Sequence, residues 1–157
     1  NNMSQYTKAS ELYQQALQIC QQIKDKHGQA SSLSGLGESY RLLSQYSKSL
    51  KFNQQALVTY QQIQDLEGEA ISFLNLGNTY KSLAQYDKAI LHYQKALSYS
   101  RKAKSYKGEA KALFNLGNVH LSLSIFLNPM KTIEYYQQAL SIFRRIKNLN
   151  EESNVLM

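Results

Sequence analysis

The side chains best suited to chemistry in this sequence are three histidines and one cysteine. His27, His92 and His120 lie far apart, and no two of them stand four residues apart, the spacing that places two zinc ligands on one helix face. We therefore expect structural histidines, and we predict neither a metal ion nor a cofactor. Cys20 is the only cysteine, which excludes an internal disulfide, and no histidine is placed by sequence to activate it. We interpret Cys20 as a small buried hydrophobic residue.

Two aspartates recur at a fixed interval and raise the question of a catalytic carboxylate pair. Asp25 and Asp65 each stand three residues before a glycine, which is a position typical of a helix N-cap. The glycines themselves form no phosphate-binding loop, because each of them belongs to a regular series along the chain. The sequence thus predicts no catalytic residue, and we do not expect an enzyme.

Composition favours one helical domain with a basic character. The 157 residues are 43% hydrophobic, contain one proline and seven glycines, and carry a formal net charge of +7. The densest basic groups are Arg101, Lys102, Lys104 and Lys107, and then Arg144, Arg145 and Lys147. We place both groups near helix ends, where cations offset the helix dipole. The alternative is a nucleic-acid or acidic-surface patch, for which Tyr106 within the first group is the local hint.

Hydropathy gives no sign of a membrane segment or a signal peptide, so we predict a cytoplasmic protein without a membrane partner. The chain begins Asn1-Asn2 and has its first methionine at position 3. We therefore expect a fragment of a longer protein.

The chain repeats itself every forty residues. Three series keep the interval: Gly28, Gly68 and Gly108; Leu36-Gly37, Leu76-Gly77 and Leu116-Gly117; and Tyr40, Tyr80 and His120. The units are a half repeat at 1–27, repeats at 28–67, 68–107 and 108–150, and the start of another at 151–157. The last full unit contains three extra residues, Leu127, Asn128 and Pro129, of which Asn128-Pro129 suits an N-cap and a first helical turn.

Apolar residues recur within each unit with a period of about 3.6, so each unit is predicted to be two helices. The expected helices span 4–23, 28–44, 47–64, 68–84, 87–104, 108–125 and 130–147, with a stub beyond 151.

The Leu-Gly pairs, the following tyrosines and the alanines of the second helices together resemble the tetratricopeptide repeat in a long, forty-residue form. The pattern is similar to that of the kinesin light chain, of adaptors with Leu-Gly-Asn repeats, and of bacterial, especially cyanobacterial, signalling proteins. The resemblance implies an all-α, right-handed superhelical solenoid of antiparallel helix pairs. The sequence departs from this pattern in one unit, where Ser49 and Asn53 replace the small and aromatic residues found at Ala89 and Tyr93.

Helical geometry assigns the glycines and the asparagines to opposite faces of each first helix. With about 100° per residue, Gly77 shares a face with Ala70, Phe73, Tyr80 and Ala84. A glycine there allows close approach of the paired helix, which offsets its cost of about 1 kcal/mol relative to alanine.

The opposite face carries Asn75 and Asn78, and in the next unit Asn115 and Asn118. Stacked first helices would align this face on one concave surface. Amide side chains can pair with the backbone of an extended segment, and in the families that the sequence resembles the corresponding asparagines contact bound peptides. The alternative is that these asparagines are solvated on the helix surface or form hydrogen bonds between adjacent repeats.

These positions and their flanks make up the predicted groove: Glu38, Arg41, Leu74, Asn75, Asn78, Lys81, Lys111, Phe114, Asn115 and Asn118. Glu38 among the cations disfavours a dedicated carboxylate clamp. We therefore predict a protein-interaction scaffold that binds an extended peptide or a helix of a partner. The alternatives are the basic patch and a spacer or regulatory module for an attached enzyme. Exposed solenoid ends would also permit self-association.

Overall fold

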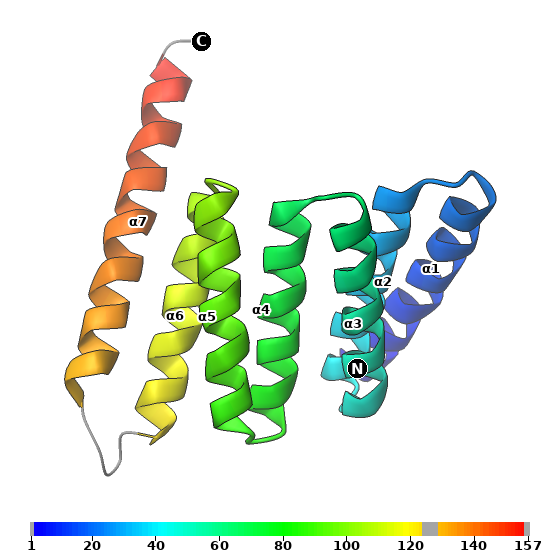
Figure 1. Cartoon of the computed structure of the whole chain (residues 1–157), viewed down its shortest axis with the longest axis horizontal. Coiled ribbons are helices and arrows are strands. Elements are labelled where there is room, and N and C mark those ends of the chain that lie inside the picture. The colour runs from blue at the N-terminus through cyan, green and yellow to red at the C-terminus, as the bar shows by residue number, and fades with distance from the viewer. Residues whose placement is uncertain (1, 124–128, 156–157) are drawn as a thin grey trace.

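The chain forms a serial array of antiparallel helices (Figure 1). The computed structural model describes the backbone of residues 2–123 and 129–155, and the side chains among them as far as Lys147. In chain order the helices are α1 (Asn2–Gln22), α2 (Lys26–Leu42), α3 (Tyr46–Gln62), α4 (Leu66–Ser82), α5 (Tyr86–Lys102), α6 (Tyr106–Leu123) and α7 (Pro129–Val155). No strand occurs in the described residues, and the predicted all-α repeat fold is confirmed.

The two helices of each unit occupy different sides of the array. Each helix packs on its neighbours in sequence, and α2, α4 and α6 also contact one another in series. Within the described part of the chain, α1, α3, α5 and α7 make no such contact among themselves. Because the first helices of the units approach more closely than the second helices, the first helices line the inner face of the curve.

The first five helices end in the same way. Lys24, Ser44, Gln64, Ala84 and Lys104 have positive φ values between 55° and 58°. In α4, for example, the amide of Ala84 donates to the Lys81 carbonyl and the amide of Gln85 donates to the Tyr80 carbonyl, both at 2.9 Å. This pair of bonds closes the helix at Ser82, two residues before the predicted end. The expectation that Ala84 packs beside Gly77 is therefore wrong, since Ala84 lies beyond the helix and is exposed.

Asp25 and Asp65 are the N-caps that the sequence predicted, although α2 and α4 begin at Lys26 and Leu66, two residues before the expected starts at 28 and 68. One carboxylate oxygen of Asp25 accepts a hydrogen bond from the Gly28 amide, and Asp65 does the same for Gly68, both at 2.9 Å. These bonds satisfy amides that have no partner within the helix. The capping role expected for both aspartates is confirmed.

The last helix differs from the sequence-based expectation. It begins at Pro129, as the first-turn preference of proline predicts, whereas the N-cap residue Asn128 lies outside the described residues. It then runs without a break to Val155, although a boundary was expected after residue 147. The sequence from 148 to 151 contains no glycine or proline to interrupt it. Arg144 and Arg145 therefore lie inside a helix and not at its end.

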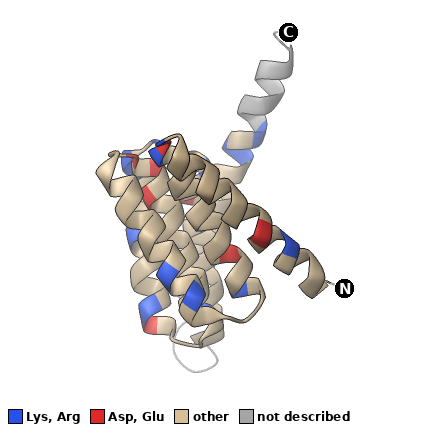
Figure 2. Cartoon of the chain, turned by 90° about the vertical axis from the view of Figure 1, so that its right-hand side faces the viewer, with Lys and Arg blue, Asp and Glu red and all other residues tan. Residues whose placement is uncertain are grey.

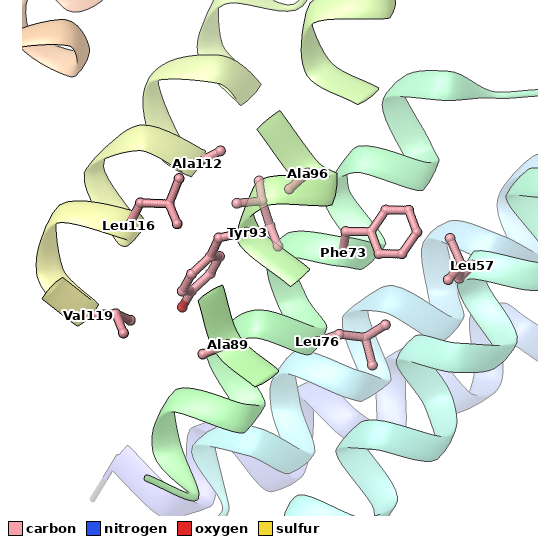
Figure 3. Close-up of a cluster of buried hydrophobic side chains, with 10 residues drawn as sticks. Leu57, Phe73, Leu76, Ala89, Tyr93, Ala96, Ala112, Leu116 and Val119 are labelled. Atoms are coloured by element: carbon pink, nitrogen blue, oxygen red, sulfur yellow. The ribbon is translucent and has the colours of Figure 1, made fainter. Parts of the chain in front are cut away.

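Close approach within each helix pair depends on the glycines predicted to pack at the seam. A Cβ added to Gly77 would lie 2.6 Å from Cε1 of Tyr93, and one added to Gly117 would lie 2.6 Å from Cε1 of Tyr136. Figure 3 shows Tyr93 at the centre of the main core cluster, between side chains of α4 and α6. The glycines thus leave room for an aromatic ring from the partner helix.

The unit that departs from the pattern replaces apolar contacts with a buried chain of hydrogen bonds. Asn53 donates to the Ser49 hydroxyl at 3.3 Å, and the Ser49 and Thr79 hydroxyls lie 2.9 Å apart. Because the Thr79 hydroxyl donates to the Asn75 carbonyl at 2.8 Å, Ser49 donates to Thr79. In the next unit Ala89 and Val119 occupy the places of Ser49 and Thr79. The polar substitutions therefore satisfy one another in part, since the Asn53 Oδ1 atom has no partner in the described residues.

A stacked pair of rings recurs at the seam of each full unit. Tyr40 stacks on Phe52, Tyr80 on His92, and His120 on Tyr135, with ring centroids 5.1 to 5.4 Å apart. His120 therefore replaces the tyrosine at the seam, as predicted. Burial lowers the pKa of His92, and the nearby charge of Lys95 lowers it further. Burial also lowers the pKa of His120, and the nearby charge of Lys131 lowers it further. Both shifts favour the neutral imidazole.

We predict that Gly77→Ala lowers the free energy of unfolding by about 1–3 kcal/mol, because the added methyl group overlaps the buried Tyr93 ring. The matched control is Gly35→Ala on α2. The Cβ at Gly35 would meet Tyr13, which is 41% exposed and can turn toward solvent. Urea denaturation followed by circular dichroism measures both. Equal stability of G77A and G35A would contradict the close-approach account.

We predict that acid destabilises the fold partly through His92. An unfolded histidine titrates near pH 6.5, so above about that pH both states are neutral and the contribution is complete. As the pH falls further, the unfolded chain binds a proton that the folded chain resists, until the lowered folded pKa is reached. His92→Phe, which copies the Tyr40–Phe52 stack, should therefore flatten the pH dependence of unfolding below about 6.5. The reverse change Phe52→His should steepen the pH dependence of the free energy of unfolding. Parallel curves for the wild type and both variants would show that burial of His92 does not contribute to the loss of stability in acid.

Candidate functional site

A depression lies on the inner face between α4 and α6, where the asparagine positions were predicted to align. Its volume is about 240 Å³. The lining residues are Glu67, Ala70, Ile71, Leu74, Asn75, Asn78, Ser100, Ser105, Lys107, Gly108, Lys111 and Asn115. Five of the ten predicted groove residues are therefore brought together here: Leu74, Asn75, Asn78, Lys111 and Asn115.

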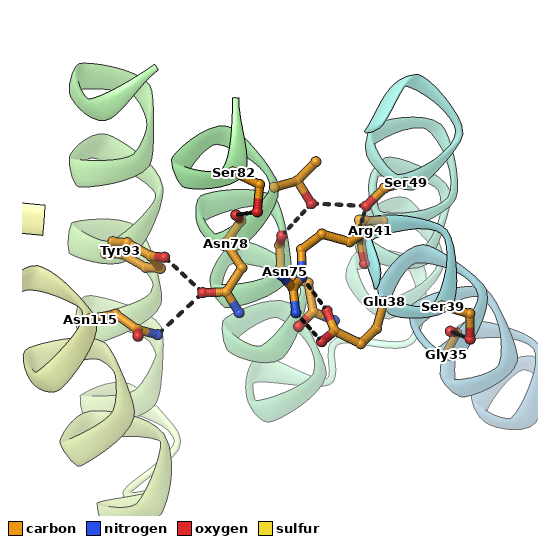
Figure 4. Close-up of polar contacts among 12 residues, drawn as sticks. Gly35, Glu38, Ser39, Arg41, Ser49, Asn75, Asn78, Ser82, Tyr93 and Asn115 are labelled. Atoms are coloured by element: carbon orange, nitrogen blue, oxygen red, sulfur yellow. Dashed lines mark hydrogen bonds and ion pairs between the residues drawn. The ribbon is translucent and has the colours of Figure 1, made fainter. Parts of the chain in front are cut away.

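Asn78 connects this depression to the core (Figure 4). Its Oδ1 atom accepts a hydrogen bond from the Tyr93 hydroxyl at 2.7 Å and a longer one from Asn115 Nδ2 at 3.4 Å. Burial raises the pKa of Tyr93, so the phenol stays protonated and donates. Both lone pairs of the Asn78 carbonyl are thus occupied, and only its NH₂ group is available for a ligand.

Asn118 repeats this arrangement one unit later. Its Oδ1 atom accepts a hydrogen bond from the Tyr136 hydroxyl at 2.7 Å. Asn78 and Asn118 therefore hold the aromatic ring of their own helix pair, a role that the sequence analysis did not foresee. The bond from Asn115 to Asn78 also agrees with the alternative interpretation, in which asparagines join adjacent repeats.

Asn75 and Asn115 keep more hydrogen-bonding capacity. Both are half-buried and line the depression. Within the described residues, the Asn75 side chain makes no hydrogen bond, and Asn115 uses one amide hydrogen while its carbonyl oxygen has no partner. Neither side chain is turned into the seam with the paired helix. A donor and an acceptor from each residue therefore face the inner surface.

The charged groove residues lie farther along the inner face. Arg41 donates two hydrogen bonds to Glu38, at 2.6 and 2.9 Å, and these bonds raise the pKa of the guanidinium. Lys81 has no ion pair within the described residues, and burial, followed by repulsion from Arg41, lowers the pKa of its amine. The Glu38 carboxylate thus pairs with Arg41 and leaves Lys81 without an ion pair among the described residues. Phe114 is 47% exposed, and its ring centroid lies 5.8 Å from that of Tyr136.

Sequence reasoning missed several residues of the depression, notably Ser100, Ser105 and Lys107. Ser105 and Lys107 lie at the start of α6, between the expected helices 87–104 and 108–125, and Ser100 lies near the end of α5, inside the first of these expected helices. The available signal was the series Cys20, Tyr60, Ser100 and Phe143, in which a serine replaces a large ring at one junction.

The residues first considered for chemistry do not form a reactive site. His27 lies in the first turn of α2 and not in a turn between helices; its Nε2 atom is 3.3 Å from Asp65 Oδ2. Cys20 is half-buried beneath Gly28, so the expectation of full burial is wrong. Among the described residues, no three histidine, cysteine or acidic side chains gather as metal ligands, and no helix is long and apolar enough to span a bilayer.

The basic residues are distributed over several helices (Figure 2). In the densest group, Arg101 is paired with Glu109 at 2.8 Å and the Lys102 amine lies 5.0 Å from the centre of the Tyr99 ring. Tyr106, the hint of base stacking, has the Arg145 guanidinium 4.6 Å from its ring centre. These contacts occupy groups that a nucleic acid would need.

Comparison with solved structures finds the same fold in longer proteins. BtubC (BKLC) from P. vanneervenii matches with a TM-score of 0.76 and 20% identity, over 92% of this chain and 59% of that one. Aspartyl phosphate phosphatase F from Bacillus subtilis matches with a TM-score of 0.77 and 25% identity, over 98% and 38% of the two chains. A Rap protein complexed with Competence and Sporulation Factor matches with a TM-score of 0.77 and 21% identity, over 92% of this chain and 40% of that one. The chain thus spans 38% to 59% of these proteins.

Comparison with protein families identifies the repeat itself, whereas the comparison with curated proteins found no match. Two models described as Tetratricopeptide repeat match residues 1–62 and 70–106, which together make up more than half of the chain. These comparisons give no support to the nucleic-acid alternative. The chain therefore belongs to the tetratricopeptide repeat family, whose fold is typically a non-enzymatic scaffold for protein interactions.

Proposed function

We propose that the inner face of this scaffold binds a segment of a partner protein, with Asn75 and Asn115 as its central contacts. The observation that carries the proposal is the pair of half-exposed amides across the depression between α4 and α6. Each amide offers a donor and an acceptor, which suits the alternating carbonyl and amide groups of an extended backbone.

The surroundings of the two amides supply the rest of the contact. Ile71 is partly exposed beside the depression, and Leu74 lies in its wall, so an apolar side chain of the segment has a surface to cover. Lys111 and Lys81 extend the same face at either side, and Phe114 presents half of its ring. Recognition would thus combine backbone pairing with a small number of side-chain contacts, which fits an extended or a helical segment better than a clamp for a chain terminus.

A solved relative gives independent support for a ligand-binding role of the fold. The Rap protein that resembles this chain was captured with Competence and Sporulation Factor. That complex concerns a longer protein, and its similarity to this chain lies in the fold. It supports the choice of a binding function over a spacer without naming the ligand of this chain.

The ligand for the test is a peptide selected from a random displayed library. We expect Asn75→Ala combined with Asn115→Ala to weaken its binding by about tenfold or more, because the hydrogen bonds from two half-buried amide side chains to the peptide are lost. Fluorescence polarisation with the labelled peptide measures the dissociation constant. Asn78 and Asn118 are poor test positions, because alanine there would leave the tyrosine hydroxyls of Tyr93 and Tyr136 without partners.

The matched control is Gln54→Ala combined with Gln94→Ala, two exposed amides on the outer helices α3 and α5. The control should leave both affinity and helicity unchanged. Equal affinity of the inner-face and outer-face variants, or failure of the library to yield any binding peptide, would overturn the proposed function.

A further inference from the structure

The depression between α4 and α6 exists because one junction between units differs from the preceding one. At the junction of α3 and α4, the ring of Tyr60 fills the space beneath Gly68 and is almost completely buried. Forty residues later Ser100 takes the place of Tyr60, and its hydroxyl lies beneath Gly108, 2.5 Å from where a Cβ would stand. Replacing an aromatic ring with a hydroxymethyl group leaves a hollow at the second junction.

Ser100 places an unpaired hydroxyl in this hollow; Ser34, Ser72 and Thr132 also have unpaired buried hydroxyls among the described residues, but they do not line the depression. The residue is 0% exposed, lines the depression, and its Oγ atom has no hydrogen-bond partner in the described structure. Buried hydroxyls are normally paired, because an unpaired one costs about 1–3 kcal/mol. The hydroxyl is therefore a donor for which the protein supplies no acceptor.

The charge of this junction changes together with its shape. The residues Tyr60, Gln61, Gln62, Gln64, Asp65, Glu67 and Ile71 of the first junction correspond to Ser100, Arg101, Lys102, Lys104, Ser105, Lys107 and Lys111 of the second. Two acidic residues are lost and five basic residues are gained. Of these, Lys107 and Lys111 line the depression, and neither takes part in an ion pair within the described residues. The one carboxylate at the rim, Glu67, already accepts a hydrogen bond from Ser105 at 3.0 Å.

The start of α6 also adds positive charge to the depression. Ser105 and Gly108 lie in the wall of the depression at the amino end of this helix, where the helix dipole presents partial positive charge. At the preceding junction the same place holds the carboxylate of Asp65, which neutralises that charge. The exchange of Asp65 for Ser105 replaces the capping carboxylate with a neutral hydroxyl, which accepts a hydrogen bond from the Gly108 amide at 3.3 Å. The acidic residues that remain near this helix start are already engaged, Glu67 with Ser105 and Glu109 with Arg101.

We propose that this depression receives the carboxylate of an aspartate or glutamate side chain in the bound segment, and that it thereby fixes the position of the segment along the inner face. Ser100 would donate a hydrogen bond to the carboxylate, while Lys107 and Lys111 would neutralise it from the rim. This inference rests on the proposed function, since the acidic residue belongs to the peptide that Asn75 and Asn115 hold.

The test uses the same displayed peptide library on the whole chain. Peptides selected by the wild-type chain should carry an acidic residue at one fixed position. Changing that residue to its amide should weaken binding to the wild type by about five- to tenfold, as expected for a half-exposed ion pair with an added hydrogen bond. The variant K107E/K111I restores the side chains of the preceding junction at two exposed positions. It should still select peptides but without the acidic preference.

The control K8E/K51I changes the net charge equally at exposed sites on α1 and α3, and it should retain the acidic preference. S100A should weaken binding of the acidic peptide and leave its amide form unaffected. Selection without acidic enrichment by the wild type, or persistence of that enrichment in K107E/K111I, would overturn the inference. In both cases loss of binding in the Asn75 and Asn115 variant would show that the proposed function itself stands.

Discussion

The contact between a glycine on one helix and an aromatic ring on its paired helix determines how the two helices pack and where the amides of the inner face lie. Gly77 faces Tyr93 and Gly117 faces Tyr136, at separations that leave no room for a side chain on the first helix. The same two tyrosines then donate their hydroxyls to Asn78 and Asn118. Packing inside the helix pair and the position of the amides on the inner face are therefore parts of one arrangement. It recurs after forty residues for the glycine and the asparagine, and after forty-three for the tyrosine, which follows the three-residue insertion.

Where the repeat departs from this arrangement, neighbouring residues change together. Asn53 stands in the place of the tyrosine, and it begins a hydrogen-bonded chain through Ser49 and Thr79 that apolar residues replace in the next unit. Without a tyrosine hydroxyl to hold, Glu38 pairs with Arg41 instead. Each unit thus satisfies the same geometric constraint with different chemistry, and the inner face becomes different at every step along the array.

Most of the fold was accessible from sequence because it depends on features with a fixed period. The Leu-Gly pairs, the capping aspartates and the seam tyrosines gave the number of helices, their pairing and their packed faces. Helix ends were placed about two residues late, since Lys24, Ser44, Gln64, Ala84 and Lys104 adopt a left-handed conformation in which glycine is the usual residue. The depression was missed in part because it depends on how Ser100, Leu74 and Lys111 meet across three helices, which no local pattern records.

The central claim is that the amides of α4 and α6 form a ligand-contacting surface held in place by the helix pairs behind it. Nuclear magnetic resonance of the ¹⁵N-labelled chain, titrated with a selected peptide, tests this claim most directly. The account predicts that shift changes concentrate on the side-chain and backbone amides of Asn75, Asn115 and their neighbours on the inner face. Changes concentrated on α3 and α5, with the inner amides unmoved, would contradict it.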